Sequence, residues 1–187
     1  SLETVGLPTG LTVIGKDAFS GCTALQSIEM PAALVSIGDG GFRNCAALTG
    51  IFVEPGNRKY ADEDGILYSA DKTALIFCPA GKKLRSFTVP DHVYSIEDNA
   101  FIDCMGLLSI VIPEGVTSIG DSAFYRNWEI TNISIPGSVT SIGKYAFYGC
   151  SSLETINIPK KIIINTIDFI VFFFVIIVTS YLIIAIN

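Results

Sequence analysis

Cysteine and histidine side chains are the groups in this chain of 187 residues with the clearest capacity for nucleophilic, acid–base or metal chemistry. There are five cysteines and one histidine. Four of the cysteines fall three residues after a recurring phenylalanine, at Cys22, Cys45, Cys104 and Cys150. A zinc site would require clustered ligands at C-x2-C-like spacing, and the sequence has none. We therefore predict no metal site from the cysteines.

Carboxylates and the single histidine are the other candidates. The run 62–65, Asp-Glu-Asp-Gly, resembles part of a calcium loop, but the other ligands and the closing glutamate are missing, so we interpret it as a turn. His92 follows Pro90-Asp91 without a partnering Ser or Cys motif, which predicts a solvated corner residue. We expect no catalytic residue, no cofactor and no enzymatic activity.

A repeat with a fixed period must position all of these residues. Phe19 and Phe42 are 23 residues apart, and the same step separates Phe101, Phe124 and Phe147. The same step also separates the prolines Pro90, Pro113, Pro136 and Pro159. A period of this size is typical of a solenoid, in which each repeat is one coil stacked on the preceding coil.

Each repeat contains two short apolar patterns. One repeat, from Leu107, is LLSIVIPEGVTSIGDSAFYRNWE, and the next, from Ile130, is ITNISIPGSVTSIGKYAFYGCSS. L-x-x-I-x-I predicts a strand that the proline ends, V-x-x-I-G predicts a second extended segment, and Ala-Phe predicts a short helical turn. We expect positive φ at the glycines of this pattern, Gly15, Gly38, Gly120 and Gly143. The side chains expected to point inward in one repeat are Leu107, Ile110, Ile112, Val116, Ile119 and Phe124.

The third repeat is longer than the others. Leu48 and Leu84 are 36 residues apart, which makes a variant coil over about 48–83. The apolar runs 66–68 and 75–77 flank a turn at 70–72, so we predict an added β-hairpin that protrudes near residues 60–80.

Stacked coils also determine what the cysteines can do. Neighbouring coils lie about 4.8 Å apart, and parallel side chains keep their Cβ atoms wider than the roughly 3.8 Å of a disulfide. We therefore predict free thiols that fill one column of the core. Cys78 is off this phase and is expected to pack in the added hairpin.

The repeats resemble the BspA-type leucine-rich repeat family of surface proteins in bacteria and some protists. The residues that carry the resemblance are LSIVIPEGVTSIGDSAF (108–124), ISIPGSVTSIGKYAFYGCSSL (133–153) and the variant YADEDGILYSADKTALIFCP (60–79). It covers about residues 1–159 and implies a mainly β, right-handed leucine-rich-repeat solenoid of about 23-residue coils. It also implies surface display and adhesion to proteins, and it brings no catalytic residue.

The C-terminal tail, residues 160–187, differs from the repeats. Its uncharged run FIVFFFVIIVTSYLIIAI, from Phe169 to Ile186, has 18 residues, the length of a spanning helix, and we predict a transmembrane helix over 162–186. The run is also rich in β-branched and aromatic residues, so translated non-coding sequence stays open as an alternative. Lys160 and Lys161 precede the run and no cation follows it, which by the positive-inside rule favours repeats on the cytoplasmic side of a membrane.

Outward-facing strand positions form the candidate binding surface. A net charge of −6 argues against a nucleic-acid partner held through phosphates. We predict a ligand face for a protein or glycan at Glu29, Phe52, Thr88, Val111, Ser134 and Asn157. A parallel column holds Thr4, Ser27, Gly50, Ser86, Ser109, Asn132 and Thr155, and Asn132-Ile133-Ser134 is an N-glycosylation sequon.

These observations favour a non-enzymatic adhesion module at a cell surface, anchored in the membrane by its tail. The alternatives are an intracellular scaffold, tail-anchored on the cytoplasmic face of a membrane, and a soluble repeat fragment whose tail is artefactual. The sequence leaves the oligomeric state open.

Overall fold

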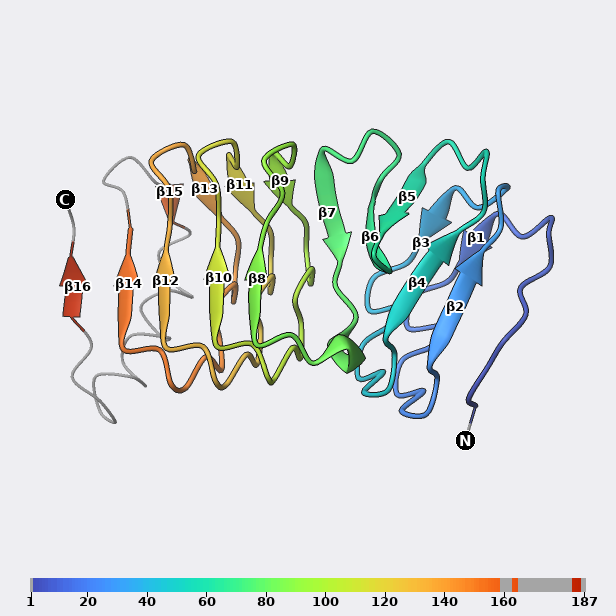
Figure 1. The fold of residues 1–187 in the computed structure, drawn as a ribbon, viewed down its shortest axis with the longest axis horizontal. Coiled ribbons are helices and arrows are strands. Elements are labelled where there is room, and N and C mark those ends of the chain that lie inside the picture. The colour runs from blue at the N-terminus through green and yellow to red at the C-terminus, as the bar shows by residue number, and fades with distance from the viewer. Residues whose placement is uncertain (1, 159–162, 165–182, 186–187) are drawn as a thin grey trace. The chain divides into compact units, whose positions relative to one another are not determined.

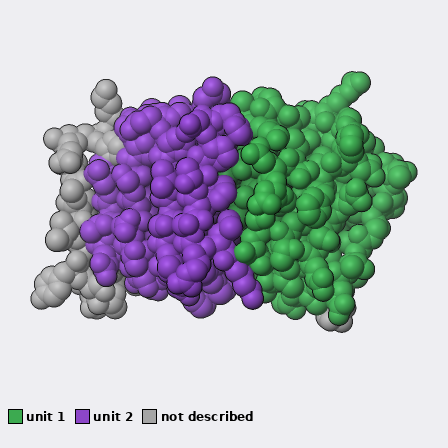
Figure 2. Space-filling view, in the orientation of Figure 1, with its two compact units in different colours: residues 1–82 green, residues 83–187 purple. Residues whose placement is uncertain are grey.

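The computed structural model describes residues 2–158, 163–164 and 183–185. The chain divides into two compact units, unit 1 (Ser1–Lys82) and unit 2 (Lys83–Asn187) (Figure 2). In both, short β-strands are joined by turns and loops (Figure 1). Within the described ranges, the single helical element is the 3-10 helix η1 (Ala80–Lys82).

Unit 2 is a stack of coils joined by two parallel ladders. One ladder contains β8 (Ser86–Thr88), β10 (Ser109–Val111), β12 (Asn132–Ser134) and β14 (Thr155–Asn157). The other contains β9 (Ser95–Ile96), β11 (Ser118–Ile119) and β13 (Ser141–Ile142). Ser86 pairs with Ser109, Ser109 with Asn132, and Asn132 with Thr155. Each partner is one sequence period away, which confirms the coil of about 23 residues.

The first coils of unit 1 form two parallel ladders of their own. β1 (Val13–Ile14) pairs in parallel with β3 (Ser36–Ile37), and β2 (Ser27–Met30) pairs in parallel with β4 (Gly50–Val53). A proline follows β2 directly, as its missing N–H donor leads one to expect at a strand end.

The Ala-Phe segments form a third connection between coils in place of the predicted helical turn. The backbone N–H of Phe101 donates to the carbonyl of Ala123 at 2.7 Å, and Phe124 donates in the same way to Ala146 at 2.7 Å. The phenylalanine rings of successive coils stack, with centroids 5.2 Å apart for Phe101–Phe124 and 5.5 Å apart for Phe124–Phe147. Each coil is therefore held to its neighbours along three sides.

The predicted inward residues make up the core. All six expected in the repeat from Leu107 are at most 7 % exposed: Leu107, Ile110, Ile112, Val116, Ile119 and Phe124. The alternation within β12, where buried Ile133 stands between exposed Asn132 and Ser134, shows how a three-residue strand separates core from surface.

The repeat glycines do not adopt the positive φ that was predicted for them. Positive φ instead occurs two residues after this glycine position and two residues after the phenylalanine, as at Tyr145 (φ 55°) and Gly149 (φ 78°). The glycines are needed because coils approach closely. A Cβ built on Gly120 would lie 2.5 Å from the backbone nitrogen of Asp98, and one on Gly143 would overlap the backbone nitrogen of Asp121.

The variant coil contains the predicted hairpin and one further strand. β6 (Ile66–Ser69) pairs antiparallel with β7 (Ala74–Phe77) and with β5 (Tyr60–Glu63). Asp64 (φ 49°) and Gly65 (φ 70°) connect β5 to β6, as in a type I′ turn. The hairpin does not protrude as predicted, because the side chains 66–68 are buried and Leu67 joins the core cluster of unit 1.

The tail forms strands at the positions that the structure describes, where a helix was predicted. β15 (Ile163–Ile164) pairs in parallel with β13, and β16 (Ile183–Ala185) pairs in parallel with β14. The other residues of the predicted transmembrane helix lie outside the described ranges. Among the residues described, no helix has the length and apolar character needed to cross a membrane.

Candidate functional site: the outer face of the strand ladder

Two parallel rows of side chains cover the outside of the long ladder in unit 2, and we call them the strand face. The first row is Thr88, Val111, Ser134 and Asn157, and the second is Ser86, Ser109, Asn132 and Thr155. All are exposed except Ser109, which is half-buried. The buried side chains between the rows, such as Ile133 and Ile156, fix which side chains face outward.

The chemistry of the strand face is neutral and polar. Hydroxyls and amides supply donors and acceptors at a spacing of about 4.8 Å along each row, and none of these eight side chains is ionisable near neutral pH. Val111, which is 58 % exposed, is its one large apolar side chain. Such a face can hydrogen-bond a neutral ligand and offer one apolar contact, but it has no acid, base or nucleophile.

Unit 1 carries the other two predicted face residues. Glu29 on β2 stands opposite Phe52 on β4, and Ser27 stands opposite Gly50. Phe52 is 48 % exposed, and its ring lies over Gly50, since a Cβ built on Gly50 would be 2.8 Å from the ring. The Phe52 ring thus packs on the Gly50 backbone, on the outer surface of their shared strand.

Asn132 of the sequon lies on β12, as predicted, and its side chain is exposed. Its Nδ2 donates to the hydroxyl of Thr131 at 3.3 Å. A glycan on this amide would stand in the middle of the strand face.

The cysteines are structural thiols, and none of the five is in a disulfide. Cys22 is half-buried and the other four are buried. The thiol of Cys45 donates to the carbonyl of Phe19 at 3.0 Å, and that of Cys150 donates to the carbonyl of Phe124 at 3.2 Å. Burial raises the pKa of Cys45 to about 11, aided by the charge of Cys22, and burial raises the pKa of Cys150 to about 12. Both stay protonated at neutral pH, which suits packing and disfavours nucleophilic chemistry.

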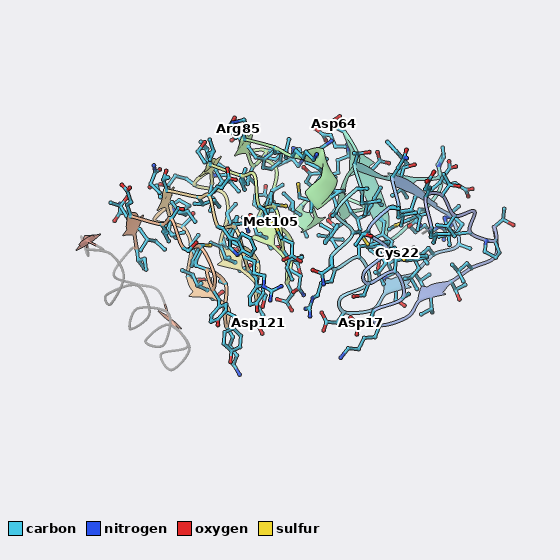
Figure 3. The ribbon with its side chains drawn as sticks, turned by 90° about the horizontal axis from the view of Figure 1, so that it is seen from below. Asp17, Cys22, Asp64, Arg85, Met105 and Asp121 are labelled. Carbon is cyan, nitrogen blue, oxygen red and sulfur yellow. The ribbon has the colours of Figure 1, made fainter. Side chains whose placement is uncertain are left out.

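The acidic side chains of residues 62–64 bond to groups in and beside the hairpin. The carboxylate of Asp62 accepts the backbone N–H of Val53 at 2.9 Å, while Glu63 pairs with Lys72 at 2.9 Å. Asp64, at the turn (labelled in Figure 3), pairs with Lys82 at 3.2 Å. Within the described part of the chain, no group of three or more His, Cys, Asp or Glu side chains could hold a metal ion. His92 is exposed, in agreement with the corner position predicted for it.

A second exposed surface in unit 2 was missed by the sequence analysis. The rings of Tyr125 and Tyr148 stack at 5.3 Å, Tyr145 meets Tyr148 edge-on at 6.0 Å, and the guanidinium of Arg126 lies 5.3 Å from the centroid of Tyr125. Tyrosine and arginine are enriched in protein interfaces. The signal was present in the repeat, because a tyrosine follows the repeat phenylalanine at both 125 and 148.

The sequence pattern described as "BspA type Leucine rich repeat region" matches the chain in six copies, over residues 1–64 and 76–184. The chain belongs to the BspA-type leucine-rich repeat family. The resemblance inferred from the repeats is thereby confirmed, and the matched region extends past the repeats into the apolar tail. No curated protein matches the chain.

Solved structures of bacterial leucine-rich repeat proteins are similar to this one. A leucine-rich repeat protein from Eubacterium ventriosum is 34 % identical with a TM-score of 0.74, over 81 % of this chain and 40 % of that one. A leucine rich cell surface protein from Faecalibacterium prausnitzii is 34 % identical with a TM-score of 0.70, over 87 % of this chain and 49 % of that one. The pneumococcal vaccine antigen PcpA is 26 % identical with a TM-score of 0.67, over 82 % of this chain and 44 % of that one. The chain thus spans less than half the length of these proteins.

Proposed function

We propose that the chain is a non-enzymatic recognition module that is displayed at a cell surface and binds a protein or glycan ligand through the strand face. The observation that carries this proposal is the strand face itself. It presents two straight rows of hydroxyl and amide groups on a framework held by backbone pairing, with Val111 as an exposed apolar contact. Because the framework is rigid, little conformational entropy is lost when a ligand binds there.

Display at a cell surface is supported by the family and by one relative. The similar protein from Faecalibacterium prausnitzii is described as a leucine rich cell surface protein. PcpA, described as a vaccine antigen, is a further bacterial relative of the same fold. The chain covers 49 % of the first protein and 44 % of the second.

Recognition without catalysis is supported by the chemistry of the described side chains. The thiols of Cys45 and Cys150 are protonated and bonded to carbonyl oxygens, and the carboxylates of 62–64 are bonded to Val53, Lys72 and Lys82. The net charge of −6 also disfavours nucleic acid as the ligand. Attachment to a membrane through the tail stays a prediction, and so does the alternative of an intracellular scaffold.

Matched serine-to-arginine substitutions test the strand face. Ser134 lies in the middle of the first row, whereas Ser151 is equally an exposed serine but lies outside both rows. The full chain would be immobilised and probed with purified matrix proteins and a glycan array. We expect S134R to weaken binding of any retained ligand at least about tenfold, as for a central interface position, and S151R to leave it unchanged.

A third variant distinguishes the strand face from the second exposed surface of unit 2. We call that surface, formed by Tyr125, Arg126, Tyr145 and Tyr148, the tyrosine surface. Tyr148→Ala removes the ring that contacts both other tyrosines and leaves the strand face intact. If Y148A abolishes binding while S134R has no effect, the strand face is not the ligand site. If all three variants bind the ligand as tightly as the original chain, neither the strand face nor the tyrosine surface is the ligand site.

A further inference from the structure

Two adjacent coils of unit 2 hold the tyrosine surface in place. Segments 122–126 and 144–148 occupy the same repeat positions and are joined by three backbone hydrogen bonds of 2.7–2.8 Å. Tyr125 and Tyr148 stack across this connection, and the guanidinium of Arg126 lies over the Tyr125 ring. Because backbone and ring contacts already order these side chains, a ligand that binds them loses little free energy in ordering them.

Two side chains of the tyrosine surface occupy positions where the backbone favours small residues. Tyr145 (φ 55°) and Arg126 (φ 60°) are both left-handed, a conformation that costs free energy for a residue with a large side chain. In other coils the position of Tyr145 holds Asp17, Gly40, Asn99 and Ser122, and that of Arg126 holds Gly21, Asn44, Asp103 and Gly149. Glycine, asparagine and aspartate tolerate this conformation best. The backbone thus accounts for the residue types in those coils, but not for an exposed tyrosine and an exposed arginine in these two.

Arg126 and Lys144 give the tyrosine surface positive charge, although the chain as a whole has a net charge of −6. Both side chains are exposed, and no ion pair among the described residues involves either of them. The carboxylate of Asp121 (labelled in Figure 3) accepts the backbone N–H of Lys144 at 2.6 Å. The guanidinium that lies on the Tyr125 ring therefore keeps its N–H donors available for a carboxylate from another molecule.

The size of the tyrosine surface limits the kind of partner. Tyr145 and Tyr148 are 48 % and 41 % exposed, and Tyr125 is half-buried. Since an aromatic side chain has roughly 150–250 Å² to bury, the three rings and Arg126 together present about 300 Å². A stable interface between two folded proteins takes about 800 Å² from each partner. A short segment of chain therefore fits this surface better than a folded domain or a second copy of this protein.

We infer that the tyrosine surface binds a short acidic segment of a partner protein, with carboxylates on Arg126 and Lys144 and apolar side chains on the tyrosine rings. Tyrosine and arginine are among the residues that contribute most binding energy at protein interfaces, and arginine is the usual reader of acidic motifs. This site goes beyond the proposed function and does not depend on it, because the tyrosine surface and the strand face share no residue.

The repeats themselves supply the test variants. R126G introduces the residue type found at Gly149, and Y145N introduces the residue type found at Asn99. Each substitution suits the left-handed backbone and removes one proposed contact with the ligand. The matched control is R85A, which removes an exposed arginine of unit 2 that lies outside the tyrosine surface.

Binding to the full chain would be measured by fluorescence anisotropy of a labelled peptide of alternating glutamate and leucine. We expect R126G and Y145N each to weaken binding of this peptide at least about tenfold, as for central interface residues. R85A should change it less than about twofold, because a distant exposed charge is screened by salt. The midpoint of thermal unfolding, followed by circular dichroism, should stay the same or rise in R126G and Y145N, because the left-handed backbone is relieved of a large side chain.

Failure of the glutamate peptide to bind, equal binding of a matched lysine peptide, or an equal loss in R85A and R126G would each overturn the proposal. A lowered unfolding midpoint in R126G and Y145N would do the same, because both side chains would then serve the fold. A labelled heparin oligosaccharide is the last probe. If it binds through Arg126 and the glutamate peptide does not bind, the ligand is an anionic glycan and the proposal of a protein segment is wrong.

Discussion

At the scale of single residues, the side chain at one repeat position of the core donates a hydrogen bond to a phenylalanine carbonyl. The donor is a thiol in some repeats and an amide in another. Cys45 and Cys150 each donate a thiol hydrogen to the carbonyl of the repeat phenylalanine one coil earlier. Asn127 occupies the same repeat position, and its Nδ2 donates to the carbonyl of Phe101 at 2.8 Å. The column therefore satisfies a buried carbonyl in addition to filling space. The sequence predicted the column and its thiols but not these bonds, which depend on how one coil sits on the next.

Asn127 makes this hydrogen bond but leaves its own side-chain oxygen unpaired. It is fully buried, and its Oδ1 has no hydrogen-bond partner. Cysteine would keep a donor to the Phe101 carbonyl and remove the unpaired acceptor. We expect N127C to raise the free energy of unfolding by about 1 kcal/mol in urea denaturation, because an unpaired buried polar group costs about 1–3 kcal/mol.

The control for this prediction is N127A. Alanine removes the unpaired oxygen but also the donor to Phe101, so we expect it to lower the free energy of unfolding. If N127C were less stable than the original chain, the amide would have to be satisfied in a way that the thiol cannot reproduce.

At the scale of the elements, the repeat period predicted much of the fold. The strand positions, their proline ends and the inward residues followed from the L-x-x-I-x-I pattern, because alternation within a strand is a local property. The backbone conformation at the repeat glycine did not follow from the pattern. Positive φ and close approach both select glycine, and only the stacked coils show that approach is the reason at Gly120 and Gly143.

The same limit applies to the hairpin and to the candidate site. The strands 66–68 and 75–77 were predicted from their apolar runs, but their burial depends on contacts with other coils of unit 1. The outward rows of the strand face follow from alternation alone. The tyrosine surface was missed because Tyr145 and Tyr148 meet only when adjacent turns are folded.

Two glycines at the same repeat position give a prediction at this scale. A Cβ on Gly143 would overlap the Asp121 backbone, whereas a Cβ on Gly15, in the first coil, meets no atom within 4 Å. Neither glycine has a positive φ, so backbone conformation does not distinguish them. We expect G143A to lower the free energy of unfolding by about 1–3 kcal/mol, as for overpacking, and G15A to change it by less than about 0.5 kcal/mol. Equal effects in urea denaturation would mean that glycine is required here for some reason other than coil spacing.

At the scale of the whole molecule, each unit is a set of coils that interact with their nearest neighbours. Phe124 stacks on Phe101 and on Phe147 and is fully buried. Phe19, in the first coil, stacks on Phe42 at 5.6 Å and is only partly buried. In such an array the stability of a coil is the sum of its own term and one interface term for each neighbour. A substitution in a coil with two neighbours therefore weakens two interface terms, whereas one in a coil with a single neighbour weakens one.

Phenylalanine-to-leucine substitutions measure this difference directly. Leucine keeps an apolar side chain in the column but removes the ring, so F124L loses two stacked pairs and F19L loses one. Each aromatic pair contributes about 0.5–1.5 kcal/mol beyond burial, and we expect F124L to be the more destabilised variant by at least that amount in urea denaturation. The number of stacked pairs that each ring makes would then account for the difference between the two variants. If F19L costs as much as F124L, the first coil must gain from another source what it lacks in neighbours, and the nearest-neighbour description would not hold for this protein.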